Sequence, residues 1–181
     1  MDLFETIEKR RSIRKFKPKT LPIDHLKKIL SAGRLAPSGG NRQPWFFIIV
    51  RETETKKKLS IVADDQEFIA DADTVVIAIG DPLTSARKLP YKLSTTRIAF
   101  KQDPMIAVEH MVLAATALGY GTCWIGAFNE NAVKKMLKIP ESLAVIALLP
   151  IGVANETPQA RPRKPFTEIF FMESYGTPME S

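Results

Sequence analysis

Three runs of apolar, β-forming residues constrain the fold of this 181-residue chain more than any other feature. They lie at residues 45–50 (WFFIIV), 74–80 (TVVIAIG) and 143–153 (LAVIALLPIGV). Short runs that are rich in branched and aromatic side chains predict buried β-strands. Pro150 lies inside the third run, and we expect it to interrupt that strand or to lie at its edge, because proline has no amide hydrogen to donate to a sheet.

Segments with helical periodicity lie between these runs. We expect helices over residues 2–10, 23–35, 53–62, 103–118 and 129–137, and one more strand over residues 122–128. Asp2 and Asn129 stand at the starts of the first and last helices, where their side chains cap backbone N–H groups well. Residues 81–101 lack clear periodicity and contain two prolines. We expect a long loop there, and loops of that length are often functional.

The predicted helices carry recognisable faces. The first helix has an apolar stripe of Leu3, Phe4 and Ile7, and the second places Ile23, Leu26, Ile29 and Leu30 on one face. In the third helix, the consecutive residues Lys56, Lys57 and Lys58 are expected to form a solvated face.

Length and composition indicate one globular domain over residues 1–181. A chain of this size buries about 70% of its unfolded surface and needs no metal or disulfide to hold it together. Cys123 is the only cysteine, so no intrachain disulfide can form, as is usual in a reducing cytoplasm. We find no signal-peptide core and no apolar run near the about 20 residues that span a bilayer. We therefore expect a soluble cytoplasmic protein without a membrane partner.

A formal net charge of +6 has three possible explanations: a generic solvated surface, a nucleic-acid footprint, or attraction for phosphorylated small molecules. No zinc-finger, RNA-recognition or basic-zipper pattern is present, so we expect no nucleic-acid partner. Because the chain has two histidines far apart in sequence and one cysteine, we expect no metal site. Cys123 lies in an apolar segment and is expected to be an inert core thiol. His110 is expected to be a packed or half-exposed histidine.

Two arginine-rich segments lie at opposite ends of the chain. If the first helix extends far enough, Arg10 and Arg14 share one face of it, with Ser12 nearby. Arg161 and Arg163 are separated by a proline that favours extended backbone, where alternate residues point the same way. Guanidinium groups donate paired hydrogen bonds to phosphate. The alternatives are a helix end and a linker that carry solvated arginines.

A polar loop and an apolar segment complete the pattern. The loop Pro37–Trp45 holds two glycines, which permit close approach to a flat ligand, and carboxamides that present a donor and an acceptor together. Trp124, Ile125 and Gly126 can place backbone N–H groups beside a ring. The alternatives are an ordinary helix-to-strand loop and a plain core strand. Together these features predict an anionic, partly aromatic ligand, and a phosphorylated flavin fits best.

Four segments in this order carry a resemblance to a known family. Residues 10–16, 36–45, 119–126 and 161–165 are similar to motifs of the FMN-dependent nitroreductase family, and the resemblance extends over nearly the full chain. It implies an α+β fold with three layers, in which helices flank a mainly antiparallel central sheet. It also implies a homodimer in which a C-terminal arm, about residues 166–181, crosses to the other subunit, with two FMN molecules at the interface.

The resemblance also implies roles for individual residues. The residues expected to bind the cofactor are Arg10, Arg11, Ser12, Arg14, Pro37, Ser38, Gly39, Asn41, Gln66, Trp124, Ile125, Gly126, Arg161 and Arg163. The arginines and Ser12 would hold the phosphate and ribityl oxygens. The segment 37–41 would come from the partner subunit, Gln66 would contact the pyrimidine and residues 124–126 would flank the ring. Gln43 is expected to brace its own loop.

The implied activity is that of an FMN-dependent NAD(P)H oxidoreductase. Hydride would pass from NAD(P)H through flavin N5 to a small nitroaromatic or quinone-like acceptor in a ping-pong cycle, and no catalytic side chain is expected. The segment 81–101 stands where longer members carry extra helices, so the site is expected to be relatively open. Two alternatives stay open: a non-catalytic flavin storage or electron-carrier protein, and a relative that performs reductive dehalogenation or flavin cleavage.

Overall fold

The computed structural model describes residues 1–86 and 98–179. Its described strands form one sheet in which neighbouring strands pair antiparallel, with the order β1-β5-β3-β2 and with β4 paired to β5. The strands are β1 (Phe16–Lys17), β2 (Trp45–Val50), β3 (Thr74–Gly80), β4 (Gly121–Thr122) and β5 (Ala144–Ala154). The expected α+β fold with a mainly antiparallel central sheet is confirmed.

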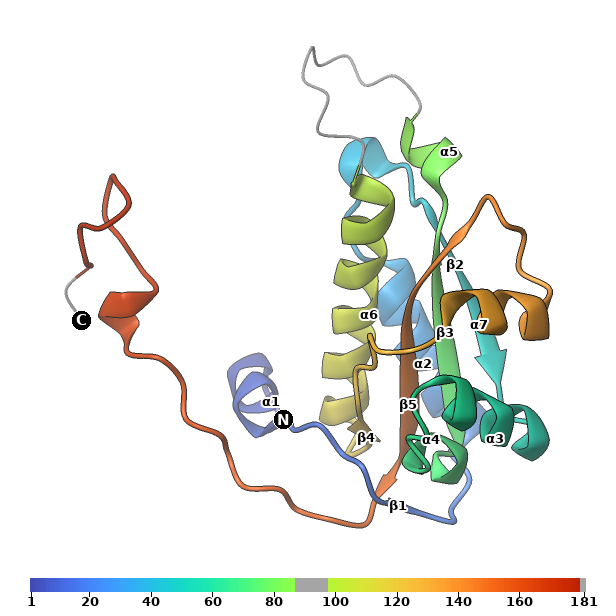
Figure 1. The fold of residues 1–181 in the computed structure, drawn as a ribbon. Helices are drawn as coiled ribbons and strands as arrows, with labels where there is room; N and C mark the ends of the chain where they lie inside the picture. Colours follow the sequence, from blue (N-terminus) through green and yellow to red (C-terminus); the bar gives the residue numbers. More distant parts are fainter. Residues whose placement is uncertain (87–97, 180–181) are drawn as a thin grey trace.

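Helices surround this sheet, as Figure 1 shows. They are α1 (Leu3–Lys9), α2 (Ile23–Arg34), α3 (Thr53–Val62), α4 (Phe68–Asp71), α5 (Pro82–Ala86), α6 (Ala99–Ala117) and α7 (Glu130–Leu137), with short 3-10 turns at Gly39–Asn41 and Phe166–Glu168. The predicted caps are confirmed, because the Asp2 side chain accepts from the amide of Glu5 and the Asn129 side chain accepts from the amide of Ala132.

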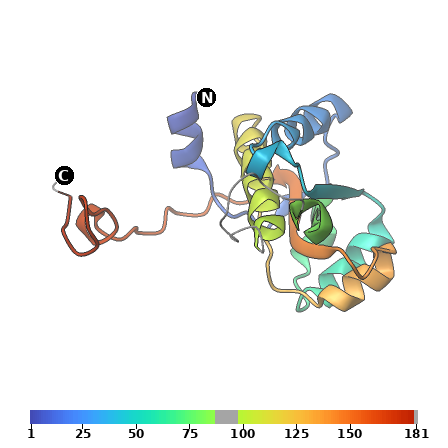
Figure 2. The same ribbon diagram turned by 90° about the horizontal axis from the view of Figure 1, so that it is seen from above.

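The two faces of β3 divide the core into two apolar clusters. Val75 and Ile77 pack in a cluster that includes Leu59 of α3, Ile69 of α4 and Val133 of α7. The alternate residues of the strand, among them Val76, pack on the opposite face with side chains of α2 and α6. The result is the expected three-layer body, with α2 and α6 on one side of the sheet and α3, α4 and α7 on the other (Figures 1 and 2).

Small residues let the layers approach closely. A Cβ built at Gly80 would lie 2.0 Å from the carbonyl oxygen of Phe100 in the first turn of α6. A Cβ at Gly33 would lie 2.2 Å from the Met111 Cε atom, where α2 packs on α6. Gly80 has no room for a side chain because backbone blocks it, whereas a side chain at position 33 would require the flexible Met111 side chain to shift.

Two strand predictions need correction. The expected strand over residues 122–128 contributes only β4 and an isolated bridge between Ile125 and Leu148. Pro150 does not interrupt β5, since it lies inside the strand opposite Val75. Its carbonyl accepts from the amide of Cys123, at 3.4 Å. In an antiparallel strand the carbonyl and amide nitrogen of one residue point to the same side, so the missing N–H faces Cys123 and costs no bond to β3.

Three further expectations differ from the structure. Ile23 is exposed at the start of α2, and Phe46 is 53% exposed because β2 is an edge strand of the sheet. The loop expected over residues 81–101 begins with the short helix α5, and α6 starts at Ala99, before the predicted start at residue 103. The rest of that loop, residues 87–97, lies outside the described residues.

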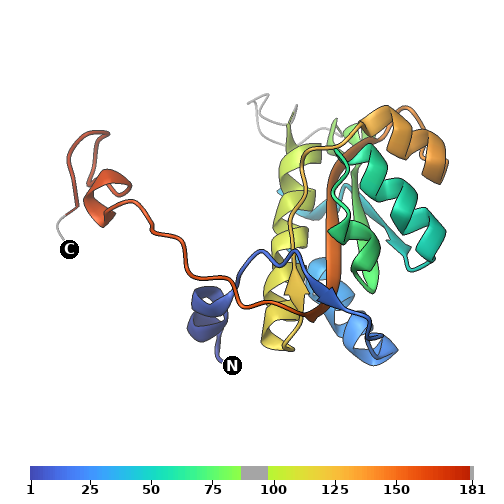
Figure 3. The same ribbon diagram turned by 60° about the horizontal axis from the view of Figure 1, so that its bottom comes forward.

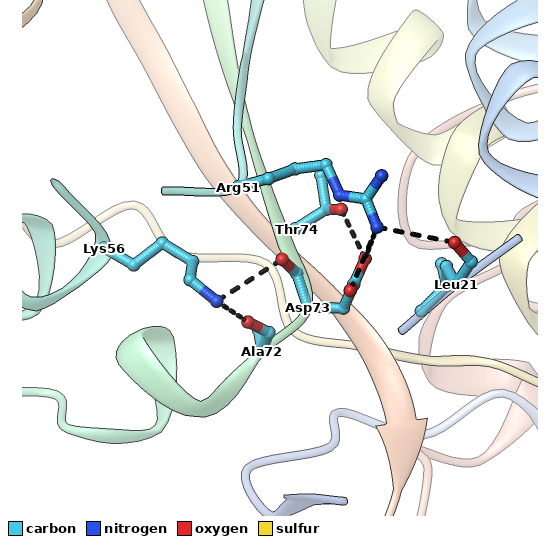
Figure 4. Close-up of polar contacts among 6 residues, drawn as sticks. All are labelled: Leu21, Arg51, Lys56, Ala72, Asp73 and Thr74. Carbon is cyan, nitrogen blue, oxygen red and sulfur yellow. Dashed lines mark hydrogen bonds and ion pairs between the residues drawn. The ribbon is translucent and has the colours of Figure 1, made fainter. Parts of the chain in front are cut away.

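Lys56 is the clearest failure of the expected solvated lysine face, because its side chain is buried (7% exposed). Its ammonium donates to the carbonyl oxygens of Ala72 and Asp73 in the turn before β3 (Figure 4). Burial lowers the pKa of Lys56, and the nearby Asp73 carboxylate opposes that shift. The same carboxylate accepts from Arg51, at 3.2 Å, and from the hydroxyl of Thr74, at 2.8 Å. These contacts tie α3 to the sheet.

The chain that follows β5 leaves this body. Figures 1 and 3 show the segment extending away to a C-terminal arm that lies apart from the sheet and its helices. The large apolar side chains exposed on the described part of the arm are Phe166, Ile169, Phe170, Met172, Tyr175 and Met179. On α1 the predicted apolar stripe is also exposed, with Phe4 at 81%. The arm therefore does not pack on the body of its own chain.

Candidate functional site: an arginine-lined cavity

The first arginine segment is not helical. Helix α1 ends at Lys9, and Arg10 turns out of the helix with ψ 132°. The expectation that Arg10 and Arg14 share one helix face is therefore wrong. The segment runs extended beside β4 instead, where Ser12 forms a parallel bridge with Thr122 and the amide of Ile13 donates to the Thr122 carbonyl at 2.8 Å.

The two ends of the chain nevertheless meet around one cavity of about 280 Å³. The residues that line it are Arg10, Arg11, Ser12, Arg14, Glu156, Pro158, Gln159, Arg161 and Arg163. The segment after β5 follows the N-terminal segment here because Phe16 pairs with Ala154 in the β1–β5 ladder. Five arginines and one carboxylate line the cavity, so its surface is strongly cationic.

The arginines of this cavity differ in what they bind. Among the described residues, the guanidinium groups of Arg10, Arg14 and Arg161 form no hydrogen bond or ion pair with the protein. Arg11 donates to the carbonyls of Glu8 and Arg10, at 2.6 and 2.7 Å, and so caps the last turn of α1. Arg163 donates weakly to its own segment, at 3.1 and 3.4 Å. Unpaired guanidinium groups around a cavity are typical of a site for an anion.

The segment 124–126 continues from β4 and offers fewer donors than expected. Ile125 is buried, and its amide is used in a 3.0 Å hydrogen bond to the Leu148 carbonyl. Trp124 is partly exposed, and a Cβ built on Gly126 would meet no atom within 4 Å. Backbone around Gly126 therefore faces open space where a flat molecule has room.

Gln66 lies in the connection between α3 and α4. Its side-chain nitrogen, Nε2, donates to the carbonyl oxygen of Ala63 at 2.7 Å and lies 3.5 Å from the carbonyl oxygen of Ala127. The structure thus places Gln66 beside the end of the 124–126 segment. Its side-chain N–H groups point to protein carbonyls, and its side-chain oxygen forms no hydrogen bond with the described residues.

The loop after α2 is held in a defined shape. Gly40, Asn41 and Gln43 have positive φ angles of 60°, 52° and 51°. The Gln43 amide donates to the Ser38 hydroxyl at 2.9 Å, and its side chain lies 3.3 Å from both oxygens of Asn41, which confirms Gln43 as a brace. The positive φ angles of the non-glycine residues are costly and are maintained by these contacts.

Asp103 anchors this loop to α6 and was not predicted. Its buried carboxylate accepts from the amide of Gly39 at 3.1 Å. Burial raises the pKa of Asp103, and the hydrogen bond from Gly39 and the charge of Arg42 oppose that shift. Asp103 stands before Pro104 at the expected start of a helix, and no local pattern predicts a hydrogen bond to a residue 64 positions away.

Within one chain, the loop lies beside the N-terminal end of α6, whereas α1, which leads into the arginine segment, lies beside the other end of that helix (Figure 1). The loop contacts Asp103 in the N-terminal part of the helix, whereas α1 packs near Leu113 and Ala117. At about 1.5 Å per residue, these parts of α6 are about 15–20 Å apart. The structure therefore brings together residues 10–14, 161 and 163, with 124–126 following directly from β4, and leaves Pro37, Ser38, Gly39 and Asn41 remote.

Glu156 is a second residue that the sequence analysis missed. One oxygen of its carboxylate accepts from the backbone amides of Arg14 and Lys15. An isolated glutamate in a segment without periodicity carries no sequence signal for such a contact.

Cys123 is buried, as expected of a core thiol. Burial raises the pKa of its thiol, and the charge of Arg14 opposes that shift.

The remaining side chains offer little redox or metal chemistry of their own. Within residues 1–86 and 98–179, no cluster of three histidine, cysteine or acidic residues is arranged to hold a metal ion. His110 is half-buried, with Nδ1 3.3 Å from the carbonyl of Ala32, as expected of a packed histidine. In the described part of the chain, no helix combines the length and apolar character needed to cross a membrane.

Comparison with known proteins gives a consistent answer. The family model described as Nitroreductase family matches residues 7–76 and 61–153. A protein of Archaeoglobus fulgidus with the provisional name NADH dehydrogenase/NAD(P)H nitroreductase is 34% identical over 159 residues, which cover 86% of this chain and 87% of the relative.

Solved structures agree with this match. A nitroreductase family protein from Clostridium novyi NT is 35% identical with a TM-score of 0.78, over 98% of this chain and 97% of that chain. The NADPH:FMN oxidoreductase from Vibrio harveyi, in complex with NAD⁺, is 25% identical with a TM-score of 0.86, over 96% of this chain and 77% of that chain. The matched residues and the shared three-layer architecture show that this chain belongs to the nitroreductase family.

Proposed function

We propose that this protein is an FMN-dependent NAD(P)H oxidoreductase of the nitroreductase type. One observation carries the proposal: three guanidinium groups without a partner in the described part of the chain, those of Arg10, Arg14 and Arg161, surround one cavity in a member of this family. The names of the relatives, which include an NAD(P)H nitroreductase and an NADPH:FMN oxidoreductase, support an oxidoreductase that uses a flavin and a reduced nicotinamide.

The residues of the cavity suit the phosphate end of FMN. Arg10, Arg14 and Arg161 would donate charge-assisted hydrogen bonds to a phosphate dianion, and Ser12 would donate to a ribityl or phosphate oxygen. Arg11 would contribute through the end of α1 that it caps, and Arg163 through its charge. This division of roles follows from the hydrogen bonds that Arg11 and Arg163 already form.

The open backbone beside the cavity suits the ring. Gly126 leaves space above its own backbone, and the exposed face of Trp124 gives an aromatic surface beside it. The side-chain oxygen of Gln66 would accept from a ring N–H. When bound, FMN would supply the redox chemistry, taking hydride from NAD(P)H and passing electrons to a nitroaromatic or quinone-like acceptor in a ping-pong cycle. The protein's part is to bind and orient the cofactor and acceptor, without a catalytic acid or nucleophile.

A second copy of the chain would complete the site. Pro37, Ser38, Gly39 and Asn41 lie too far along α6 to reach the arginine cavity of their own chain, as described above. The arm and α1 expose apolar side chains that a partner subunit would cover. We therefore propose a homodimer in which the arm, residues 166–181, crosses to the partner. Light scattering at several protein concentrations tests the point, because it measures how readily the dimer dissociates with and without the arm. Unchanged dissociation of the chain without the arm contradicts the exchanged arm.

The visible absorption spectrum of the purified protein tests the proposed activity. We expect a bound flavin that anaerobic NADH or NADPH bleaches and that a quinone or nitroaromatic compound restores. A bound flavin that neither nucleotide reduces favours a storage or electron-carrier protein. If iodinated or brominated tyrosine restores the oxidised spectrum and releases halide, while nitroaromatic compounds do not, the chain is a reductive dehalogenase. A colourless protein that takes up no added FMN contradicts the proposal.

A further inference from the structure

We propose that Glu156 is a positioning residue of the arginine cavity, which fixes the main chain at Arg14 and so aims its guanidinium group at an anionic ligand. The inference rests on the proposed function, because the anion that it concerns is the phosphate of FMN. Glu156 lines the cavity together with the arginines and is the only carboxylate among the described residues that line it. It is half-buried.

The contacts of Glu156 follow directly after the backbone pairing of β1 with β5. The ladder pairs Phe16 with Ala154, and the amide of Asn155 then donates to the carbonyl of Lys15 at 2.8 Å. At the next residue, a side chain replaces the backbone as the acceptor: the Glu156 carboxylate accepts hydrogen bonds from the backbone amides of Lys15 and Arg14. We call these two hydrogen bonds of Glu156 the clamp. The clamp holds the two arginine segments, which are remote in sequence, side by side.

Two successive amides that point at one oxygen form a small concave site for an anion. Here the carboxylate of Glu156 occupies that site, so an incoming phosphate is left to the guanidinium side chains. Within the described residues, Glu156 forms no ion pair with any arginine of the cavity. Its hydrogen bonds are made with backbone amides, so Glu156 occupies none of the guanidinium groups of Arg10, Arg14 and Arg161.

Arg14 is thereby fixed from both sides. The preceding residue, Ile13, donates to the carbonyl of Thr122, and the following residues pair with β5. Glu156 supplies the contact at Arg14 itself. A side chain that starts from a fixed Cα position loses less conformational entropy when it binds a ligand. The negative charge of Glu156 acts in the opposite direction, because it weakens the attraction of the cavity for phosphate.

These two effects separate in two variants. Glu156→Ala removes both the clamp and the charge, whereas Glu156→Gln removes the charge and keeps an oxygen that can accept from the amides. If Glu156 positions Arg14, the alanine variant binds FMN more weakly and the glutamine variant binds FMN as well as the wild type or better. Glu8→Gln is the matched control, since it removes an equal charge near the cavity without touching the main chain at Arg14.

The experiment is a titration of the flavin-free full-length chain with FMN and with riboflavin, which lacks the phosphate. We expect Glu156→Ala to raise the Kd for FMN on the order of tenfold, the effect of about one charge-assisted hydrogen bond. The Kd for riboflavin should stay within about twofold, since its ring and ribityl contacts are unchanged. Glu156→Gln and Glu8→Gln should not weaken FMN binding.

A double mutant shows whether Glu156 acts through Arg14. We expect Glu156→Ala to add little to the loss caused by Arg14→Ala, because a clamp has no effect on a side chain that is absent. Additive losses, an unchanged FMN Kd, or equal losses for FMN and riboflavin overturn the proposal. If Glu156→Ala does not fold, Glu156→Asp replaces it, since the shorter side chain cannot reach both amides. A wild-type chain that binds neither flavin refutes the proposed function, and this inference with it.

Discussion

The body of the molecule and its rim differ in how far their apolar and charged side chains are covered or paired by the rest of the chain. The body, made of the sheet with α2, α3, α4, α6 and α7, buries residues such as Ile77 and Leu148 fully. The rim, made of α1, the arginine cavity and the arm, exposes Phe4 and Phe170. Three of its guanidinium groups have no hydrogen-bond or ion-pair partner among residues 1–86 and 98–179. The body covers its apolar side chains with contacts of its own, whereas the rim leaves apolar side chains exposed that the proposed ligand and second subunit would cover.

The largest expected effect is on the body. Leu148→Ala removes a fully buried side chain at the centre of the sheet and should lower the free energy of unfolding by about 2–5 kcal/mol. The matched change on the rim, Phe4→Ala, should cost the isolated subunit little, because that side chain is already 81% exposed. Urea unfolding of dilute protein measures both. Similar losses for the two variants would contradict the division into body and rim.

Arg14→Ala tests the cavity. The loss of one charge-assisted hydrogen bond to phosphate should weaken FMN binding by about 1.5–3 kcal/mol. Arg11→Ala is the control within the same cavity, since Arg11 donates to its own helix end and should matter less for FMN. FMN content after purification and the Kd for FMN are the measurements. Unchanged flavin content in Arg14→Ala means that the role given to Arg14 is wrong.

Lys56→Met returns to the body and should lower the free energy of unfolding by about 1–3 kcal/mol, because the carbonyl of Ala72 loses its buried donor. Lys58→Met, on the exposed side of the same helix, should have almost no effect. Thermal and urea unfolding of the two variants decide the matter. Equal changes in the free energy of unfolding for the two variants would mean that Lys56 lies on the solvated face that the sequence predicted.

The smallest expected effect concerns Asp103 and pH. Burial raises the pKa of Asp103 in the folded protein above its ordinary value of 3.8. The folded state then holds the proton more tightly than the unfolded state, so the stability from this group is present below pH 3.8 and is lost as pH rises through the folded pKa. Asp103→Asn cannot titrate. Its stability relative to the wild type should therefore increase as pH rises over this window, and a constant difference would contradict the buried state of Asp103.

Much of the body could be predicted from the sequence, because it is built from local patterns. The runs at 45–50 and 74–80 are strands, and Asp2 and Asn129 cap helices as their chemistry predicts. Failures occur where a remote partner decides. Lys56 reads as one of three surface lysines until the turn at Ala72 places a carbonyl beside it. Pro150 is tolerated because its missing N–H faces Cys123.

The rim could be predicted by residue type but not by geometry. The arginines at 10, 14 and 161 do meet at one cavity. They meet because an extended segment pairs with β4 and because β1 pairs with β5, and not through the helix face that spacing indicated. Glu156 and Asp103 act through backbone amides of residues 142 and 64 positions away, and such contacts leave no pattern in a single sequence.

The preference of the wild-type chain for FMN over riboflavin tests the central claim most directly. The two flavins share the ring and the ribityl chain and differ only in the phosphate that the arginine cavity would hold. With two or more charged hydrogen bonds to phosphate, FMN should bind at least about a hundredfold more tightly than riboflavin. Equal affinities for the two flavins would show that the cavity does not bind the phosphate and would contradict the account.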